Sequence, residues 1–148
     1  MSADVKAVLK ENLEGMRKSV HWLERSYKIC FRMGVQETYT EEQFDAWENL
    51  VSRYARAIDV ITNRVFRSID SMELEESGTM IDVVNRAEKR GIITAVDRLR
   101  DLKDIRNDIV HQYDTDDLRS LFRATLEAAP EVFAMVGKVE QYCTRFGL

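Results

Sequence analysis

The chain is poor in the residues that break helices. Its 148 residues include one proline and six glycines, which is too few for a loop-rich fold or for glycine-rich phosphate loops. No stretch alternates apolar and polar residues in the way of a half-buried strand. Internal repeats and low-complexity segments are also missing from the sequence. These absences favour an all-α fold.

Cysteine and long apolar runs are scarce as well. Cys30 and Cys143 lie far apart and lack the close spacing of metal ligands, so we expect core residues in a reducing compartment. No apolar run approaches the roughly 20 residues of a membrane-spanning helix. The N-terminus mixes charged and apolar residues, unlike a signal peptide. We therefore expect a cytoplasmic protein that does not enter a membrane.

The charge balance is slightly acidic. The sequence has 22 Lys and Arg against 26 Asp and Glu, for a net charge of −4, and 45% of its residues are hydrophobic. This composition is typical of a soluble helical domain, and the length predicts a single domain over residues 1–148. A negative net charge argues against a general nucleic-acid binder, although it leaves room for a local basic groove.

Apolar spacing predicts four long helices and one short helix. We expect long helices over about 4–33, 40–72, 94–112 and 117–146, and a short one over 79–91. Thr40, Thr79 and Thr94 each open a capping box, and Gly34 and Gly91 mark helix ends. The brief connections favour an up-and-down bundle. Asp114 and Asp117 should cap the last helix, and Pro130 should kink it.

The first two long helices carry distinct surfaces. The first has an apolar seam at alternating spacings of three and four residues, formed by Leu9, Leu13, Met16, Val20, Leu23, Tyr27 and Cys30. The second carries four arginines on one face, here called the arginine ridge: Arg53, Arg56, Arg64 and Arg67. A solvated or salt-bridged surface explains such a ridge more simply than a nucleic-acid track does, and both interpretations stay open.

The most informative segment is Arg106-Asn107-Asp108-Ile109-Val110-His111-Gln112-Tyr113, near the end of the fourth helix. A helical period places Arg106 near the middle of an apolar face, formed by Val96, Leu99, Leu102, Ile105, Ile109 and Val110. A charge in that position costs several kcal/mol unless it is paired, hydrated or facing a partner. Asp104 and Asp108 are near in sequence but point elsewhere. Asn107 and His111, four residues apart, lie along one edge of the helix.

These side chains suit phosphate chemistry. An imidazole can move a proton to or from a ribose hydroxyl near neutral pH, and a guanidinium can bind a phosphate and stabilise charge on phosphorus. Arg106 and His111 therefore suffice for RNA cleavage without a metal or other cofactor. They lie about 140° apart around the helix, so we expect a cleft between two protomers to unite them. His21 has no supporting neighbours, and we expect a structural role for it.

The segment from Arg106 to Tyr113 matches the R-x4-H-x-Y signature of the HEPN superfamily, and the chain resembles the small HepT-like branch of bacterial toxins. Asn107 matches the polar residue that commonly follows the arginine there. The resemblance implies a HEPN-like bundle and a homodimeric, metal-independent ribonuclease. Arg106 and His111 would be the catalytic pair, with Asn107 in support. The motif is short, but its place at a helix end in an all-α chain of this length makes it more specific.

The resemblance also implies a partner. Such toxins are often paired with a minimal nucleotidyltransferase (MNT) antitoxin, which transfers AMP to the tyrosine of the motif, here Tyr113. The added phosphodiester charge would repel RNA from the cleft. Two other hypotheses stay open: a non-catalytic partner or substrate-binding subunit of a nucleotidyltransferase, and a helical dimer without an active site. The sequence does not identify the RNA target, the means of neutralisation or any higher assembly.

Overall fold

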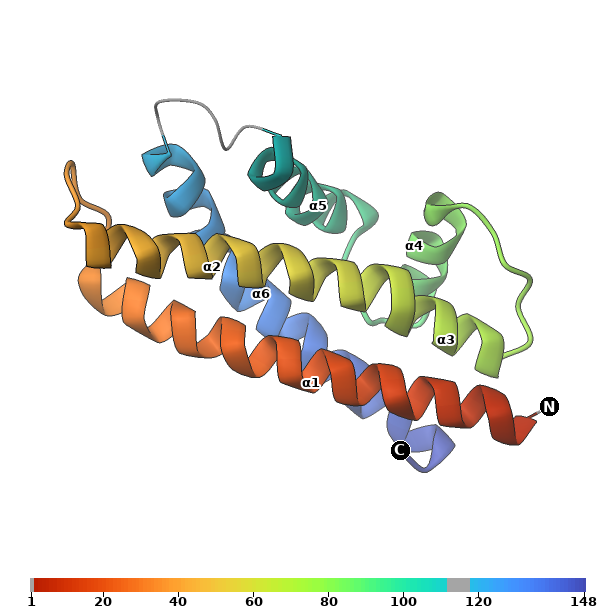
Figure 1. Ribbon diagram of the computed structural model, residues 1–148. Helices are drawn as coiled ribbons and strands as arrows, with labels where there is room; N and C mark the ends of the chain where they lie inside the picture. Colours follow the sequence, from red (N-terminus) through yellow and green to blue (C-terminus); the bar gives the residue numbers. More distant parts are fainter. Residues whose placement is uncertain (1, 112–117) are drawn as a thin grey trace.

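The computed structural model describes residues 2–111 and 118–148, and every regular element within these residues is a helix. Helix α1 is Ser2–Met33. Helix α2 (Glu41–Asp59), the π-helix η1 (Val60–Val65) and α3 (Phe66–Met72) follow one another without a break. Then come α4 (Met80–Lys89), α5 (Val96–His111), α6 (Arg119–Cys143) and the short 3-10 helix η2 (Thr144–Phe146). The expected all-α bundle of four long helices and one short helix is confirmed (Figure 1).

Two of the three expected capping boxes form, whereas the one expected at Thr94 does not, because α5 begins only at Val96. The Thr40 hydroxyl accepts from the Gln43 amide while the Gln43 side chain accepts from the Thr40 amide, and Thr79 and Asp82 repeat this arrangement. Gly34 and Gly91 follow α1 and α4 with φ of +77° and +74°, a backbone conformation that glycine adopts without strain. At the start of α5 the Val96 amide donates to the Glu88 carboxylate of α4 at 2.8 Å.

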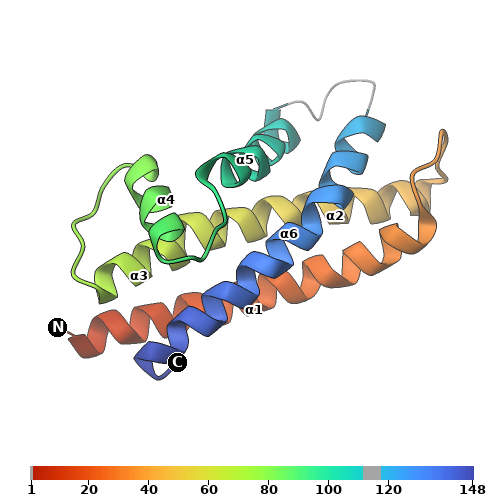
Figure 2. The same ribbon diagram turned by 180° about the vertical axis from the view of Figure 1, so that it is seen from behind.

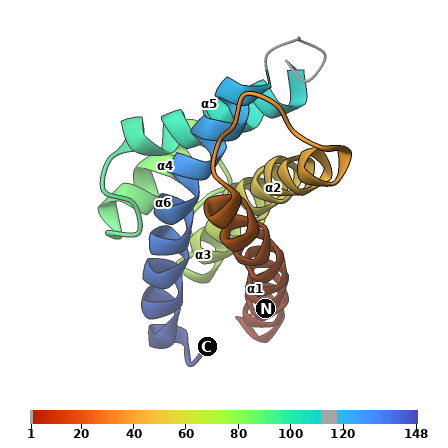
Figure 3. The ribbon, with the colours of Figure 1, turned by 90° about the vertical axis from the view of Figure 1, so that its left-hand side faces the viewer.

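The helices pack around one core. Helix α1 lies antiparallel to the α2–η1–α3 stretch, and α6 crosses both from behind (Figures 1 and 2). A view nearly along α1 places α5 on the side of α2 away from α1 (Figure 3). The predicted seam of α1 is buried at Leu9, Leu13, Met16, Leu23 and Cys30. Each fully buried leucine contributes about 1.5–3 kcal/mol to stability through the hydrophobic effect.

Both cysteines are core residues, as predicted. Cys30 and Cys143 are free thiols with no exposed surface. Burial raises the pKa of Cys30 to about 12 and that of Cys143 to about 11. The thiols therefore remain protonated at neutral pH and fill space between helices.

The last helix contains the proline that was expected to kink it. Pro130 lies inside α6, which continues without a break from Arg119 to Cys143, and Figure 3 shows a change of direction along this helix. The proline is exposed, so its ring lies on the solvent side, where a helix bends without breaking. The expected caps Asp114 and Asp117 lie outside the described residues. None of the helices in the described ranges is long and apolar enough to cross a membrane.

Candidate functional site

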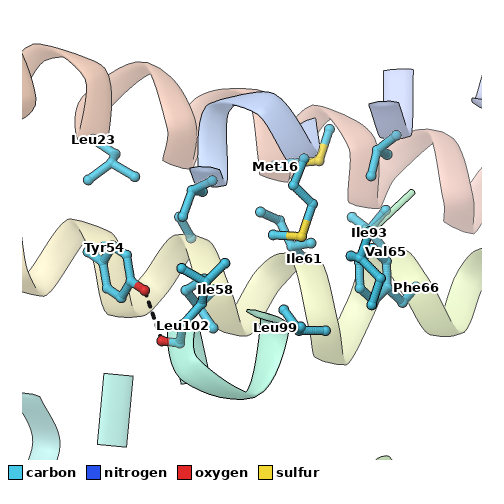
Figure 4. Packing of buried hydrophobic residues seen from close by; sticks show 14 of the residues in the cluster. Met16, Leu23, Tyr54, Ile58, Ile61, Val65, Phe66, Ile93, Leu99 and Leu102 are labelled. Atoms are coloured by element: carbon cyan, nitrogen blue, oxygen red, sulfur yellow. Dashed lines mark hydrogen bonds between the residues drawn. The ribbon is translucent and has the colours of Figure 1, made fainter. Parts of the chain in front are cut away.

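Helix α5, which carries the motif, is fixed to α2 by a buried tyrosine. The Tyr54 hydroxyl donates to the Leu102 carbonyl oxygen at 2.8 Å, and Leu99 and Ile58 pack beside this bond (Figure 4). Burial raises the pKa of Tyr54 well above its usual value, so the hydroxyl remains a donor at any physiological pH. The contact sets the position of α5 one helical turn before Arg106.

Arg106 is paired within its own chain. Its Nε and one terminal nitrogen donate to the two carboxylate oxygens of Asp59 on α2, at 2.8 and 2.9 Å. This is the two-bond fork in which a guanidinium is held most firmly in orientation. Hydrogen bonding to Asp59 raises the pKa of Arg106. The arginine side chain keeps 28% of its surface exposed, so its remaining N–H groups can reach a ligand.

The sequence left open whether Arg106 is paired, hydrated or facing a partner, and it did not identify Asp59. The charge is compensated by Asp59 of α2 within the same chain. The proposed apolar face of α5 is also narrower than expected, because Val110 is 51% exposed while Leu99, Leu102 and Ile109 are buried. A signal for Asp59 exists: it is the only acidic residue between Glu48 and Asp70.

Asp59 lies where the helix widens. It directly precedes η1, in which the Phe66 amide donates to the Ile61 carbonyl, five residues back. The buried Thr62 hydroxyl donates to the Ile58 carbonyl at 2.8 Å and so occupies an acceptor that an α-helix would use for the backbone. Single turns of π-helix of this kind are frequent at functional sites. Tyr54 and Asp59, which bond α5, precede this turn. The residues after the turn are therefore rotated about the helix axis relative to the positions that a continuous α-helix would give them.

Lys103 adds a second cation beside Arg106. Burial lowers its pKa, Asp59 opposes that effect, and the charges of Arg106 and Arg67 lower it further. Lys103 is therefore a partly desolvated ammonium in the field of two guanidinium groups. Sequence reasoning missed it because its position one turn before Arg106 is unremarkable in a helix with many charged residues.

The remaining motif residues lie at the open end of α5. Asn107 is exposed, and its amide oxygen accepts from Arg106 at 3.4 Å. His111 is the last residue of α5 and is exposed. Helix geometry separates it from Arg106 by about 7.5 Å along the axis. Tyr113 lies outside the described residues. The structure thus joins Arg106 and Asn107 directly, with His111 one turn beyond Asn107 on the same helix edge.

A small depression adjoins the site between α4 and α5. It has a volume of about 240 Å³ and is lined mainly by apolar groups, among them Met80, Val84 and Leu99, with Lys103 and Asn107 at its polar side. Such a combination of apolar walls and a few polar groups can take a planar ring system. Within the described ranges, His, Cys, Asp and Glu side chains form no group of three or more that would hold a metal ion.

The other histidine lies apart from the motif. His21 is exposed on α1, and its ring lies edge-on to that of Trp22, with 5.2 Å between the ring centres.

We found no match for the chain among protein-family models, curated proteins or solved structures. The arguments about function therefore come from the site itself.

Proposed function

We propose that this protein is a metal-independent endoribonuclease and acts as the toxin of a HEPN/MNT toxin–antitoxin pair. The observation that carries the proposal is the Asp59–Arg106 fork, which orients a charged guanidinium on the helix that ends in the exposed His111. An oriented cation and a titratable imidazole on one short helix are the groups that RNA cleavage needs.

The proposed reaction is an internal transfer at phosphorus. His111 accepts the proton of the ribose 2′-hydroxyl, and O2′ forms a bond to phosphorus as the bond to O5′ breaks. A protonated histidine gives its proton to the leaving O5′, so the products are a 2′,3′-cyclic phosphate and a free 5′-hydroxyl. The N–H groups of Arg106 that face away from Asp59 stabilise the charge that develops on the phosphoryl oxygens.

A homodimer would supply both proton-transfer groups. We propose that two protomers place their α5 ends around one cleft, where one imidazole acts as base and the other as acid. The half-exposed Val110, next to His111 on α5, gives such a contact an apolar residue to bury.

The experiment that tests this function compares substitution of His111 with the same substitution of His21 as the control. Purified protein is incubated with RNA in the presence of EDTA, and the 2′,3′-cyclic phosphate ends are measured. We expect His111→Ala and Arg106→Ala to abolish cleavage and growth arrest, while His21→Ala retains both. Far-UV circular dichroism should stay helical for all three variants. Cleavage retained by the His111→Ala protein would remove the proposed mechanism.

A second function is favoured by the depression beside Asn107. Its apolar walls and the nearby Lys103 ammonium can hold a nucleotide, and Asp59 already occupies two of the Arg106 donors. The chain would then be a non-catalytic partner or substrate-binding subunit of a nucleotidyltransferase. Stoichiometric binding of that enzyme without any RNA cleavage by the wild-type protein would support this function over the first.

We propose further that the MNT antitoxin neutralises the toxin by transferring AMP to Tyr113. The tyrosine lies two residues after His111 in the sequence, so an added phosphodiester and adenosine would fill the cleft and repel RNA. Mass spectrometry after co-expression with the nucleotidyltransferase should find AMP on the peptide that contains Tyr113, and none after Tyr113→Phe. Modification of other peptides alone would reject this assignment.

A further inference from the structure

We propose that the arginine ridge of Arg53, Arg56, Arg64 and Arg67 is the surface that binds single-stranded RNA and leads it to the Arg106–His111 site. This inference rests on the proposed ribonuclease function and assigns a path to its substrate. The ridge runs along α2, η1 and α3, and α5 is docked on the α2 part of this stretch.

The ridge carries uncompensated positive charge. Among the described residues, none of its four arginines forms an ion pair with a carboxylate. Where ridge side chains are hydrogen-bonded, the acceptors are neutral: Arg53 donates to Ser26 and to the Trp22 carbonyl, and Arg67 donates to the Gly78 carbonyl. Arg56 and Arg64 are exposed. These contacts orient the guanidinium groups without cancelling their charge, so within residues 2–111 and 118–148 the ridge is not a salt-bridged surface.

Six of the eleven arginines outside the ridge pair with carboxylates: Arg17, Arg86, Arg90, Arg98, Arg100 and Arg106. Arg25, Arg32, Arg123 and Arg145 form no ion pair with the described carboxylates either, so what distinguishes the ridge is that four such arginines lie along one stretch of helix. The sequence has more Asp and Glu than Lys and Arg residues, so carboxylates are numerous enough to pair with every arginine. The one acid within the ridge segment, Asp59, is engaged by Arg106. The described carboxylates thus leave the ridge arginines unpaired, although Asp4 lies in the groove beside Arg64 and Arg67.

The ridge and the candidate site meet at Asp59, whose carboxylate accepts two hydrogen bonds from Arg106. The Asp59 that orients Arg106 lies between Arg56 and Arg64 along the same stretch. A polyanion bound along the ridge would therefore pass the end of α5.

The shape of the surface favours single-stranded RNA over an acidic protein. Arg53 and Arg64 are separated by about 16 Å along the helix, a row that can follow successive phosphates. At one end Trp22 is 47% exposed, and the Arg53 guanidinium lies over its ring at 5.1 Å from the ring centre. Proteins that bind single-stranded nucleic acids combine exposed aromatic rings, on which bases stack, with cations that contact the phosphates. At the other end Asp4 lines the shallow groove beside Arg64 and Arg67, which limits the anionic track in that direction.

The test measures RNA binding separately from cleavage. All proteins carry His111→Ala, and the probe is a fluorescein-labelled, unstructured 20-nucleotide RNA followed by anisotropy. We expect Arg56→Glu with Arg64→Glu to weaken binding at least tenfold at low salt. The slope of log K against log salt should fall by about 1.4, because each phosphate contact on a single strand contributes about 0.7.

The matched control is Lys10→Glu with Arg32→Glu, which makes the same charge change at two exposed positions on α1 and should leave the salt slope intact. Circular dichroism checks that both double variants stay folded. Equal RNA affinity of the ridge variant and its parent overturns the proposal. Loss of nucleotidyltransferase binding without loss of RNA binding also overturns it and makes the ridge a protein interface.

The outcomes separate this inference from the ribonuclease hypothesis. If wild-type protein cleaves RNA and the ridge variant with an intact His111 cleaves it equally well, the enzyme stands and the ridge proposal falls. If RNA binding depends on the ridge but the wild-type protein never cleaves, the ridge stands as an RNA surface and the ribonuclease function falls.

Discussion

At the scale of single residues, the Asp59–Arg106 pair sets what the site can do. Both side chains are partly exposed, so the pair contributes only about 1 kcal/mol or less to folding. Its greater effect is on orientation, because a forked contact fixes the plane of a guanidinium. Asp59 is therefore a positioning residue, whereas Arg106 is the group proposed to touch the substrate.

We predict that Asp59→Asn lowers kcat for RNA cleavage about tenfold or more and changes KM little. The amide keeps one acceptor but loses the charge and the second acceptor, so Arg106 stays cationic and is no longer fixed in the transition-state geometry. The free energy of unfolding should fall by about 1 kcal/mol or less. Steady-state kinetics and urea denaturation give the two quantities.

The control for this change is Asp97→Asn, which removes an exposed pair with Arg100 three residues later on the same helix. It should alter neither kcat nor stability measurably. Asp59→Glu restores the charge on a longer side chain and should recover part of kcat. Wild-type kinetics in the Asp59→Asn protein would show that Arg106 needs no orientation from α2.

At the scale of secondary-structure elements, the position of α5 depends on α2. Tyr54 bonds the Leu102 carbonyl, and Asp59 bonds Arg106 one turn later. Tyr54 and Asp59 both lie in the regular α-helix α2, and the π-helix η1 begins directly after Asp59. The π-turn therefore changes the orientation only of the residues that follow these two contacts. Helix α4 is fixed separately, since Arg86 and Arg90 both contact the buried Asp70.

We predict that Tyr54→Phe lowers the free energy of unfolding by about 1 kcal/mol, the usual cost of losing one buried hydrogen bond. It should also reduce RNA cleavage by severalfold, because α5 loses its anchor beside the motif. Chemical denaturation and cleavage rates on the same preparation check both effects.

Tyr27→Phe serves as the matched change, because Tyr27 is a partly buried tyrosine on α1 that packs against Phe31 and Phe133. It should leave cleavage unchanged. A Tyr54→Phe protein that is destabilised but fully active would mean that the hydrogen bond supports folding and not the site.

At the scale of the whole molecule, the proposed catalytic unit contains two chains. One chain already compensates the charge of Arg106, so a dimer is needed for the proton transfers and not to shelter an unpaired cation. Arg106 and His111 lie on different sides of α5 by about 140°, and a shared cleft between two α5 ends would bring one protomer's arginine to the other's histidine.

We predict that one His111→Ala chain in a dimer is enough to abolish cleavage, because the cleft uses one imidazole as base and the other as acid. In a mixed dimer of one wild-type and one His111→Ala chain, a single imidazole remains and cannot serve as both groups in the same step. Cleavage assays on co-refolded mixtures test this, with each protein refolded alone as the control. Mixed dimers, isolated by differently tagged chains, that cleave RNA at half the wild-type rate or more would place each active site within a single protomer.

The sequence by itself determined the helices and the site's composition. Local capping by Thr40 and Thr79, the left-handed glycines 34 and 91, and the seam of α1 are encoded by neighbouring residues, so spacing alone predicts them. The motif on α5 was visible for the same reason. How far Pro130 bends its helix depends on which side of the helix faces solvent, and that is a property of packing.

Only the tertiary structure decided what Arg106 contacts and what the ridge arginines do not contact. Asp59 lies 47 residues before Arg106, and no spacing rule links positions on two helices until their crossing is known. The π-turn at η1 was not predicted either, because the residues from Val60 to Val65 include no proline or glycine that would mark a departure from α-helix. Local patterns determine helices because their interactions lie within a few residues, whereas pairings between helices depend on how the bundle closes.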